Sequence, residues 1–400
     1  MVLGRRVDYL SPTIYFTDIL IVLTVFFWII SKVYLKFSIF NIDKYIIKKF
    51  SIHHSQFYIL LLFIFLNIFY SISWQVALFK WLKVFEYVLF GYYIYKSKPK
   101  LEKIGIVLMV PLIYSSLISI AQFSFQKTIG GPLWLLGERT FSLVTPGISK
   151  IETCWLFSKW CKEVMRSYAT FSHPNALGGF IATLLPIVFF LQKKYISRKL
   201  ILKAKILKAI IFYFLILLIY ISLVFTFSRS AIFIGFMYSL WLVLKNINIS
   251  KKYQYIITIL VSVIIFSQFT KISLNEESVV ARVALNKSSV SIFSENPLLG
   301  VGNGNFLVAL PKFIFSREIN FLQPVHNVYL LLLSELGVFG VLVIGYFVYK
   351  IILNKRKITS LKSVYLLSLG MWLVLGFIDH YPITLQQGQI LTTLLIALLI

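Results

Sequence analysis

The chain has 400 residues, of which 59% are hydrophobic and only 14% are charged, and its mean hydropathy is +0.85. Soluble domains contain about 45–50% apolar and about 25% charged residues. The composition therefore excludes an ordinary soluble protein and indicates a membrane protein. The formal net charge of +26 would suit a nucleic-acid-binding protein, but the positions of the basic residues argue against that class.

Apolar segments long enough to cross a membrane recur along the whole sequence, since about 20 residues are needed for a helical span. We predict spans near residues 17–35, 56–73, 75–95, 104–124, 174–191, 209–227, 230–246, 254–270, 328–350, 363–378 and 383–400. The predicted fold is all-α, a polytopic bundle of about eleven transmembrane helices. Residues 1–400 are expected to form a single integral membrane domain.

Three charged residues interrupt the predicted span at residues 75–95. Lys80, Lys83 and Glu86 are spaced by three residues each and so lie close to one helix face. Charged side chains within a membrane turn toward the protein interior and pair. We therefore expect these three residues to point inward and form ion pairs.

The basic residues concentrate in every second loop. Clusters occur at residues 36–49, 96–103, 193–208, 245–252 and 355–362. Short loops rich in lysine and arginine remain on the cytoplasmic side of a membrane, which accounts for the positive charge without nucleic acid. The alternate loops then face outward, and two of them, residues 125–173 and 271–327, are long and carry most of the acidic residues. Long loops are usually functional or disordered, and the aromatic residues, proline and glycine in these two favour ordered, functional loops.

This orientation places the N-terminus outside, with Arg5 and Arg6 on the side that basic residues avoid. A preceding first helix, missing from this sequence, would explain the arrangement. Alternatively, the other basic clusters determine the orientation, and two arginines at the N-terminus are too few to change it.

The segment IETCWLFSKWCKEV, in the first long loop, is compatible with an amphipathic helix. Such a helix would lie in the membrane interface or pack against the bundle. Within it, Cys154 and Cys161 would stand about 10 Å apart along the axis. A disulfide needs Cα atoms within about 7 Å, so the helix and the disulfide exclude each other. The sequence does not decide whether the cysteines are oxidised.

Several common chemistries have no motif in this chain. The sequence contains no GxxxxGK[ST], HExxH or CxxC pattern and no carboxylate-rich loop suited to a metal. We therefore expect neither a metal nor another cofactor. Glycines at positions 300, 302 and 304 fall in a loop, where they favour a tight turn over a backbone nest for an anion.

The candidate site residues are basic side chains at the outward ends of the predicted spans. Arg229 lies in the short turn FTFSRSA, and Arg282 lies in VVARVALN of the second long loop. His326 directly precedes the span at residues 328–350, His173 precedes another, and His380 follows Asp379 in FIDHYP. Lipid-headgroup contacts for Arg229, solvent exposure for Arg282 and a purely structural role for His326 are the alternatives at this point.

Together these residue types suit transfer of a group from a lipid diphosphate. Arginine binds phosphate oxygens through two parallel hydrogen bonds. Histidine titrates near neutral pH and is the commonest general base. A base next to diphosphate-binding arginines would let an acceptor hydroxyl attack a sugar C1 while the lipid diphosphate leaves, and this reaction needs no nucleotide.

The order of motifs resembles that of the O-antigen ligase and O-antigen polymerase family of bacterial membrane glycosyltransferases. These motifs are TFSHPNALGGF, FTFSRSA, ARVALN, ENPLLGVGNGNF, HNVYLLLLSELGVFG and DHYPITLQQGQIL. The resemblance covers residues 170–400 well and the first third mainly through hydropathy.

The resemblance implies a glycan donor carried on undecaprenyl diphosphate at the outer side of the bacterial cytoplasmic membrane. It places the catalytic histidine at His326 and the diphosphate-binding arginines at Arg229 and Arg282. His173, Asn175 and Asn327 match family positions with supporting roles; Asp379 and His380, in the closing motif, are further supporting candidates. Members have about twelve spans, which agrees with a missing first helix.

The acceptor stays open. Ligation to a lipid, polymerisation of repeat units and transfer to a protein share the same donor and motifs. A transporter that flips lipid-linked glycans is the alternative from another functional class. Such a transporter needs a charged path through the bilayer, whereas intramembrane charges here are few: Lys80, Lys83, Glu86 and Glu335.

Overall fold

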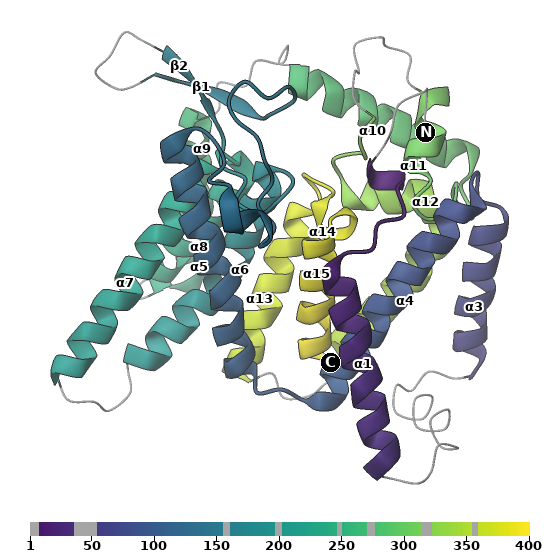
Figure 1. Cartoon of the computed structure of the whole chain (residues 1–400), viewed down its shortest axis with the longest axis horizontal. Coiled ribbons are helices and arrows are strands. Elements are labelled where there is room, and N and C mark those ends of the chain that lie inside the picture. Colours follow the sequence, from purple (N-terminus) through teal and green to yellow (C-terminus); the bar gives the residue numbers. More distant parts are fainter. Residues whose placement is uncertain are drawn as a thin grey trace. The chain divides into compact units, whose positions relative to one another are not determined.

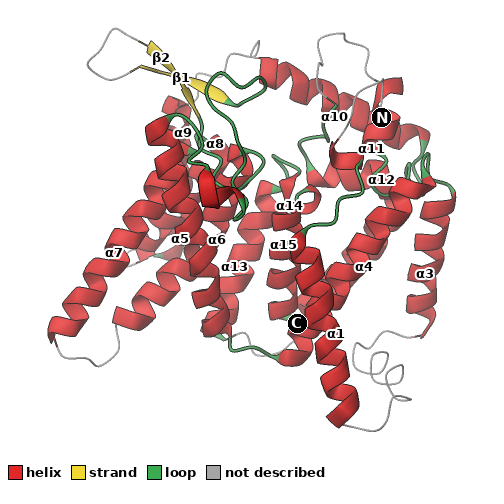
Figure 2. Cartoon of the chain, in the orientation of Figure 1, coloured by secondary structure: helices red, strands yellow, loops and turns green. Residues whose placement is uncertain are grey.

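A computed structural model describes residues 8–35, 54–154, 161–196, 202–245, 250–269, 277–313, 322–353 and 359–400. Nearly all of this structure is helical, with one two-stranded sheet (Figure 2). The described chain divides into two compact units. Unit 1 comprises Met1–Lys98, Ser273–Arg356 and Gly376–Ile400, and unit 2 comprises Pro99–Ile272 and Lys357–Leu375.

The described residues of unit 1 form three helices from the start of the chain and a second group from its last third (Figure 1). The helices are α1 (Phe16–Leu35), α3 (His54–Phe69), α4 (Trp74–Ser97), α10 (Glu277–Glu295), α11 (Phe306–Ala309), α12 (Val328–Leu353), α14 (Tyr381–Thr384) and α15 (Gln386–Leu399), with short 3₁₀ turns η1 (Asp8–Leu10) and η4 (Leu310–Lys312).

Unit 2 is built around one buried helix. Its elements are α5 (Leu101–Phe125), η3 (Gly131–Trp134), β1 (Lys150–Cys154), β2 (Cys161–Met165), α6 (Pro174–Ile196), α7 (Leu202–Phe225), α8 (Arg229–Lys245), α9 (Lys251–Phe269) and α13 (Ser360–Leu375). Helix α6 packs against α5, α7, α8 and α13. Gly178 of α6 has no room for a side chain, because a Cβ there would lie 2.9 Å from the Cβ of Ser228 and 3.0 Å from that of Ala231. Small residues of this kind allow close helix packing.

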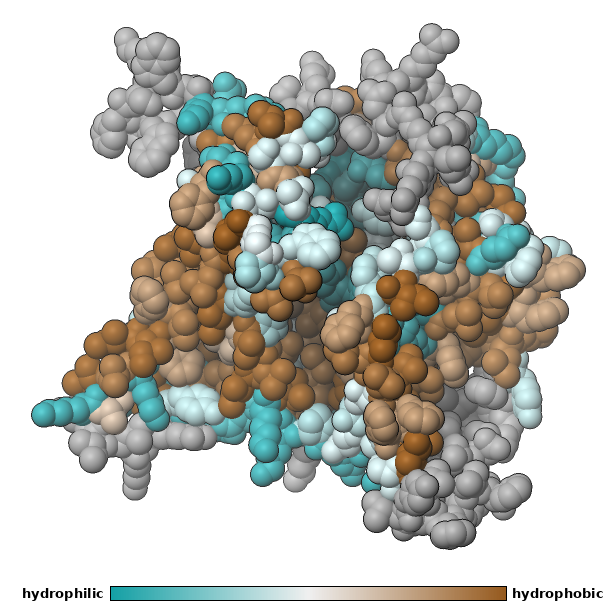
Figure 3. Space-filling model, viewed as in Figure 1, coloured by the Kyte–Doolittle hydropathy of each residue, from teal (hydrophilic) through white to brown (hydrophobic). Residues whose placement is uncertain are grey.

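Each of the eleven predicted spans coincides with a helix. Within the described residues, four stretches are long and apolar enough to cross a membrane: Leu101–Phe125, Pro174–Ile196, Lys203–Phe225 and Val328–Tyr346. Shorter apolar helices are Tyr58–Phe69, Ser360–Leu375 and Gln386–Leu399. Hydrophobic side chains cover much of the outside of the helices (Figure 3), as expected for surfaces that face lipid. The chain is therefore a multi-pass helical membrane protein.

The charged residues of α4 pair as predicted. Lys83 forms ion pairs with Asp18 of α1 and with Glu86, the latter at 3.4 Å. Lys80 interacts electrostatically with Glu335 of α12. The interactions with Asp18 and Glu335 connect α4 to α1 and α12 within unit 1, and all of them keep charge away from lipid.

The glycine-rich loop before α11 is a tight turn, and its amide groups are not available to an anion. Gly300, Gly302 and Gly304 have φ angles of 68°, 100° and 77°, a region that favours glycine. The backbone N–H groups of this loop donate within the protein: Gly300 to the Asn296 carbonyl, Val301 to that of Ser334, Gly302 to that of Glu335 and Asn303 to Asn67 Oδ1. The preference for a turn over an anion nest is confirmed.

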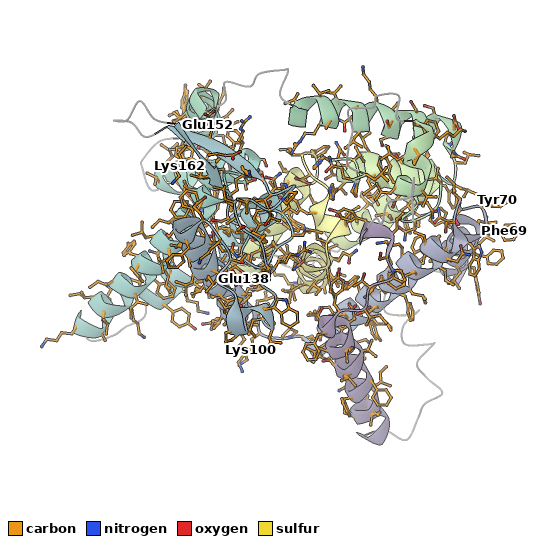
Figure 4. The ribbon with its side chains drawn as sticks, turned by 45° about the horizontal axis from the view of Figure 1, so that its top comes forward. Phe69, Tyr70, Lys100, Glu138, Glu152 and Lys162 are labelled. Carbon is orange, nitrogen blue, oxygen red and sulfur yellow. The ribbon has the colours of Figure 1, made fainter. Side chains whose placement is uncertain are left out.

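The helix predicted in the first long loop is wrong, because this segment forms an antiparallel hairpin of β1 and β2. Glu152 and Lys162, labelled in Figure 4, mark its two strands. The β-branched residues Ile151, Thr153 and Val164 favour extended backbone, and Met165 is fully buried against Phe141 and Tyr168.

In the hairpin, Cys154 stands directly opposite Cys161. The geometric conflict expected between a helix and a disulfide therefore does not arise. The tryptophans and Lys159 of the expected amphipathic stripe fall at residues 155–160, outside the described residues. Arg5, Arg6 and the basic residues at 36–49 and 355–357 also lie outside them.

Candidate functional site

The clearest cluster of ionisable side chains lies in unit 1, before α12 and around α14. His326 Nδ1 lies 3.2 Å from Asp379 Oδ1, and the backbone N–H of His380 donates to the same oxygen at 2.8 Å. The imidazole rings of His326 and His380 have their centroids 5.1 Å apart. Residues separated by more than fifty positions in the sequence thus form one group.

Asn327 explains why these segments meet. Its Oδ1 accepts hydrogen bonds from the backbone N–H groups of Tyr329 and Leu330, at 2.9 and 3.0 Å, and so caps the start of α12. Its Nδ2 donates to the carbonyl of Phe377 at 3.1 Å. One amide side chain therefore fixes both the start of the helix behind His326 and the segment that leads to Asp379.

The hydrogen bonds around Asp379 define which nitrogen of His326 is available for chemistry. A carboxylate only accepts hydrogen bonds, so His326 donates its Nδ1–H to Asp379. Nε2 then carries the lone pair and is the proton acceptor. The side chain of His326 is 14% exposed, whereas that of Asp379 is 7% exposed, so the histidine is the more accessible partner.

His380 has a different environment from His326. Its Nδ1 lies 2.7 Å from Thr384 Oγ1, and its ring packs edge-to-face with Tyr9 at 5.7 Å. Burial lowers the pKa of His380 to about 4; the neighbouring Asp379 opposes this effect, while His326 and Arg282 add to it. His380 is consequently neutral at physiological pH, and its buried position suits support rather than direct attack on a substrate.

The depressed pKa of His380 predicts a loss of stability on acidification. An unfolded histidine protonates near pH 6.5, whereas folded His380 protonates only near pH 4. Between these values the unfolded chain binds the extra proton, so stability falls as pH falls through this window. We expect the melting temperature in detergent to fall less steeply from pH 7 to pH 4.5 in His380→Gln than in the wild type. Parallel slopes would contradict this role of His380.

Arg282 joins the same group from α10. Its segment of the second long loop is helical. Its guanidinium Nη1 donates to the carbonyl of Ile378 at 3.3 Å, next to Asp379, and its charge is close enough to disfavour protonation of His380. An arginine and an accessible histidine, both predicted from the sequence, therefore lie on one side of unit 1 beside a carboxylate.

The described part of the chain contains one group of possible metal ligands, formed by His326, Asp379 and His380. One ligand atom from each of His326, Asp379 and His380 lies within 4.8 Å of the others. Imidazole and carboxylate ligands suit a transition metal such as zinc. However, hydrogen bonds account for the same arrangement, because each ring Nδ1 and Asp379 Oδ1 is engaged within the protein.

The remaining candidates, His173, Asn175 and Arg229, belong to unit 2. The Asn175 backbone N–H donates to His173 Nδ1 at 3.1 Å, which orients the histidine at the start of α6. Arg229 is the first residue of α8 and is exposed. The structure thus associates Arg282, His326, Asn327, Asp379 and His380 in one unit, and His173 and Asn175 in the other.

Arg166 has a structural role that was not predicted from the sequence. Its guanidinium donates to the Thr226 carbonyl at 2.7 Å, to Ser149 Oγ at 2.9 Å and to Asn175 Oδ1 at 2.6 Å. Arg166 therefore connects the hairpin, the TFSHPN segment and the turn that leads to Arg229. The sequence shows only that Arg166 lies just before the TFSHPN motif, and this position does not predict which groups its side chain contacts.

No curated protein sequence matches the chain. A family model described as O-antigen ligase matches residues 212–345, which include Arg229, Arg282 and His326. His173, Asn175, Asp379 and His380 fall outside the matched residues. The match confirms the resemblance predicted from the motifs, and residues 212–345 are similar to the O-antigen ligase family.

Proposed function

We propose that this protein is a membrane glycosyltransferase of polysaccharide biosynthesis that moves a glycan from undecaprenyl diphosphate to an acceptor hydroxyl. The family match supports an O-antigen ligase type of function. The observation that carries the chemical proposal is the hydrogen bond between His326 and Asp379 next to Arg282. O-antigen ligation and O-antigen polymerisation fit this site equally, as does transfer to a protein.

The proposed reaction is a base-assisted displacement at the anomeric carbon. His326 Nε2 takes the proton of the acceptor hydroxyl while its oxygen attacks C1 of the donor sugar. The bond between C1 and the diphosphate oxygen breaks, and the lipid diphosphate leaves with its electron pair. Asp379 stabilises the imidazolium that forms, in the way a carboxylate supports the histidine of a catalytic triad.

Arginine side chains are proposed to hold the diphosphate. Arg282 lies beside the histidine pair, and a guanidinium matches phosphate oxygens through two parallel hydrogen bonds. Arg229 belongs to unit 2. Its proposed role in binding the diphosphate therefore rests on the family resemblance alone. Asn327 and His380 are proposed to position His326 and Asp379, while His173 and Asn175 organise the start of α6.

A reconstituted assay tests the function directly. Purified protein in liposomes, given a polyprenyl-diphosphate glycan and an acceptor glycolipid, should form product without nucleotide. Because the proposal needs no metal, EDTA should leave the rate unchanged. Loss of activity in EDTA that zinc restores would instead assign the cluster of His326, Asp379 and His380 to a metal. Movement of the lipid-linked glycan across the bilayer without any transfer would support the transporter alternative.

We also propose that the site faces the outer side of the bacterial cytoplasmic membrane. The alternation of basic clusters supports this orientation, because short loops rich in lysine and arginine stay in the cytoplasm. In a background without Cys154 and Cys161, a cysteine at Asn303 should react with an impermeant thiol reagent in intact cells, and one at Leu200 should not. Labelling of Leu200→Cys but not of Asn303→Cys would show that the orientation is the reverse of the one proposed.

A further inference from the structure

The loop after α5 carries an exposed apolar tip. Three consecutive large apolar side chains are exposed there: Trp134 is 64% exposed, Leu135 79% and Leu136 61%. A contiguous exposed group of large apolar side chains indicates a surface that contacts another apolar phase.

The ends of this loop are held together beyond the last turn of α5. Lys127 pairs with Ser142 in an isolated antiparallel bridge, and the backbone N–H of Thr128 donates to the Phe141 carbonyl at 3.1 Å. Lys127 and Thr128 come two and three residues after Phe125, the last residue of α5. The bridge therefore marks the neck of the loop.

From this neck the apolar tip folds back along α5. The Tyr114 hydroxyl lies within 3.4 Å of the Leu136 carbonyl, and Tyr114 is near the middle of α5. The eleven residues from Tyr114 to Phe125 correspond to about 16 Å of helix, or about three turns. Because α5 is long and apolar enough to span a membrane, a tip at this level of the helix would meet lipid chains and not headgroups.

Several backbone polar groups of the loop are satisfied within the protein, which lowers the cost of placing them in a membrane. Glu138, labelled in Figure 4, is 3% exposed and its carboxylate accepts the backbone N–H groups of Ile129 and Gly130 at 2.9 and 2.8 Å, and Gln122 Nε2 at 2.8 Å. The N–H groups of Leu136 and Gly137 donate to carbonyls within the turn, at 3.0 and 3.1 Å. Pro132, near its start, has no N–H to satisfy.

The charges around the tip also suit a membrane. Lys127 and Arg139 flank it and are exposed, where basic side chains reach lipid headgroups. Glu138 is the only acidic residue between Gln126 and Ser149, and its carboxylate is turned inward. The surface of the loop is thus apolar at its tip and cationic at its base.

We propose that residues 131–136 form a short re-entrant turn that inserts into the membrane leaflet at the C-terminal end of α5. In this position Trp134, Leu135 and Leu136 contact the acyl chains of bilayer lipids. The turn anchors the first long loop, whose hairpin leads to Arg166, at a fixed depth in the membrane. This inference rests on α5 spanning the membrane and does not depend on the proposed transfer reaction.

Depth-dependent fluorescence quenching tests the proposal. The Leu135→Cys variant is made in a Cys154→Ser, Cys161→Ser background and labelled with bimane. The full chain is then reconstituted in phosphatidylcholine nanodiscs, with one protein molecule in each disc. Lipids brominated on the acyl chains should quench the label, and aqueous iodide should not. Val144→Cys is the matched control, because Val144 is apolar, 87% exposed and beyond the loop neck; its label should respond to iodide and not to the brominated lipids.

Two results would overturn the proposal. Quenching of the Leu135→Cys label by iodide as strongly as the control would place the tip in water. Protection from both quenchers would show that protein covers it. Trp134→Cys provides a second labelling site, so that misfolding of one variant does not decide the outcome. Since the readout is depth and not transfer, its failure is distinguishable from failure of the proposed enzyme activity.

Discussion

Replacement of His326 by alanine is expected to lower the rate of glycan transfer by about 10²- to 10⁴-fold, the usual contribution of a general base. The variant should retain expression, membrane insertion and binding of the lipid-linked donor, because the His326 side chain is partly exposed and precedes α12. The measurement is single-turnover transfer in reconstituted liposomes, with donor binding determined separately.

Two companion variants make this result specific. Asp379→Asn should also reduce the rate while preserving donor binding, because an amide can present its N–H to Nδ1 and so favour the wrong tautomer of His326. Thr384→Val removes a hydroxyl that hydrogen-bonds to the ring Nδ1 and the backbone carbonyl of His380, and should have a much smaller effect. Wild-type rates in both His326→Ala and Asp379→Asn would remove histidine base catalysis from the mechanism.

The helices of this protein follow from its sequence because their signal is local. A run of about 20 apolar residues in a membrane forms a helix, because the helix satisfies all its backbone hydrogen bonds internally. Each predicted span overlaps a helix of the structure. The inward pairing of Lys80 and Lys83 was equally predictable, since an unpaired charge in lipid is costly. What spacing alone could not supply was the identity of their partners on α12 and α1.

The hairpin and the inner arrangement of the site were less accessible to sequence reasoning. Apolar residues in a short loop segment fit a helix stripe and a strand face alike, and burial of Met165 decided the outcome. Asp379 and His380 were recognised as supporting candidates, but the contact between Asp379 and His326 depends on how α12 and α14 pack. A side chain such as Arg166, which connects three segments, has no local signature at all.

The hydrogen bonds of Asn327 suggest why the catalytic candidates sit at the start of α12 and not within it. The cap leaves His326 just outside the helix, where its ring stays accessible, while the same side chain holds Phe377 in place. A general base needs both a fixed tautomer and an open face. Asp379 supplies the first requirement and the position before the helix supplies the second.

The two arginines that we propose to bind the diphosphate should be sensitive even to replacement by lysine. Arg282→Lys and Arg229→Lys keep the charge but lose the planar fork that makes two parallel hydrogen bonds to phosphate oxygens. Each lost charge-assisted bond costs about 1.5–3 kcal/mol, so transfer should fall about 10- to 150-fold. The measurement is kcat/KM for the polyprenyl-diphosphate donor in liposomes.

Lys287→Arg is the matched control for Arg282, because it is an exposed basic residue on the same helix. Its transfer rate should equal that of the wild type. If the lysine variants of both arginines also transfer glycan at the wild-type rate, neither side chain clamps the donor, and Arg229 and Arg282 are then anchors for lipid headgroups. If only Arg282→Lys is impaired, the diphosphate is held from unit 1 alone, on the side of the hydrogen-bonded pair of His326 and Asp379.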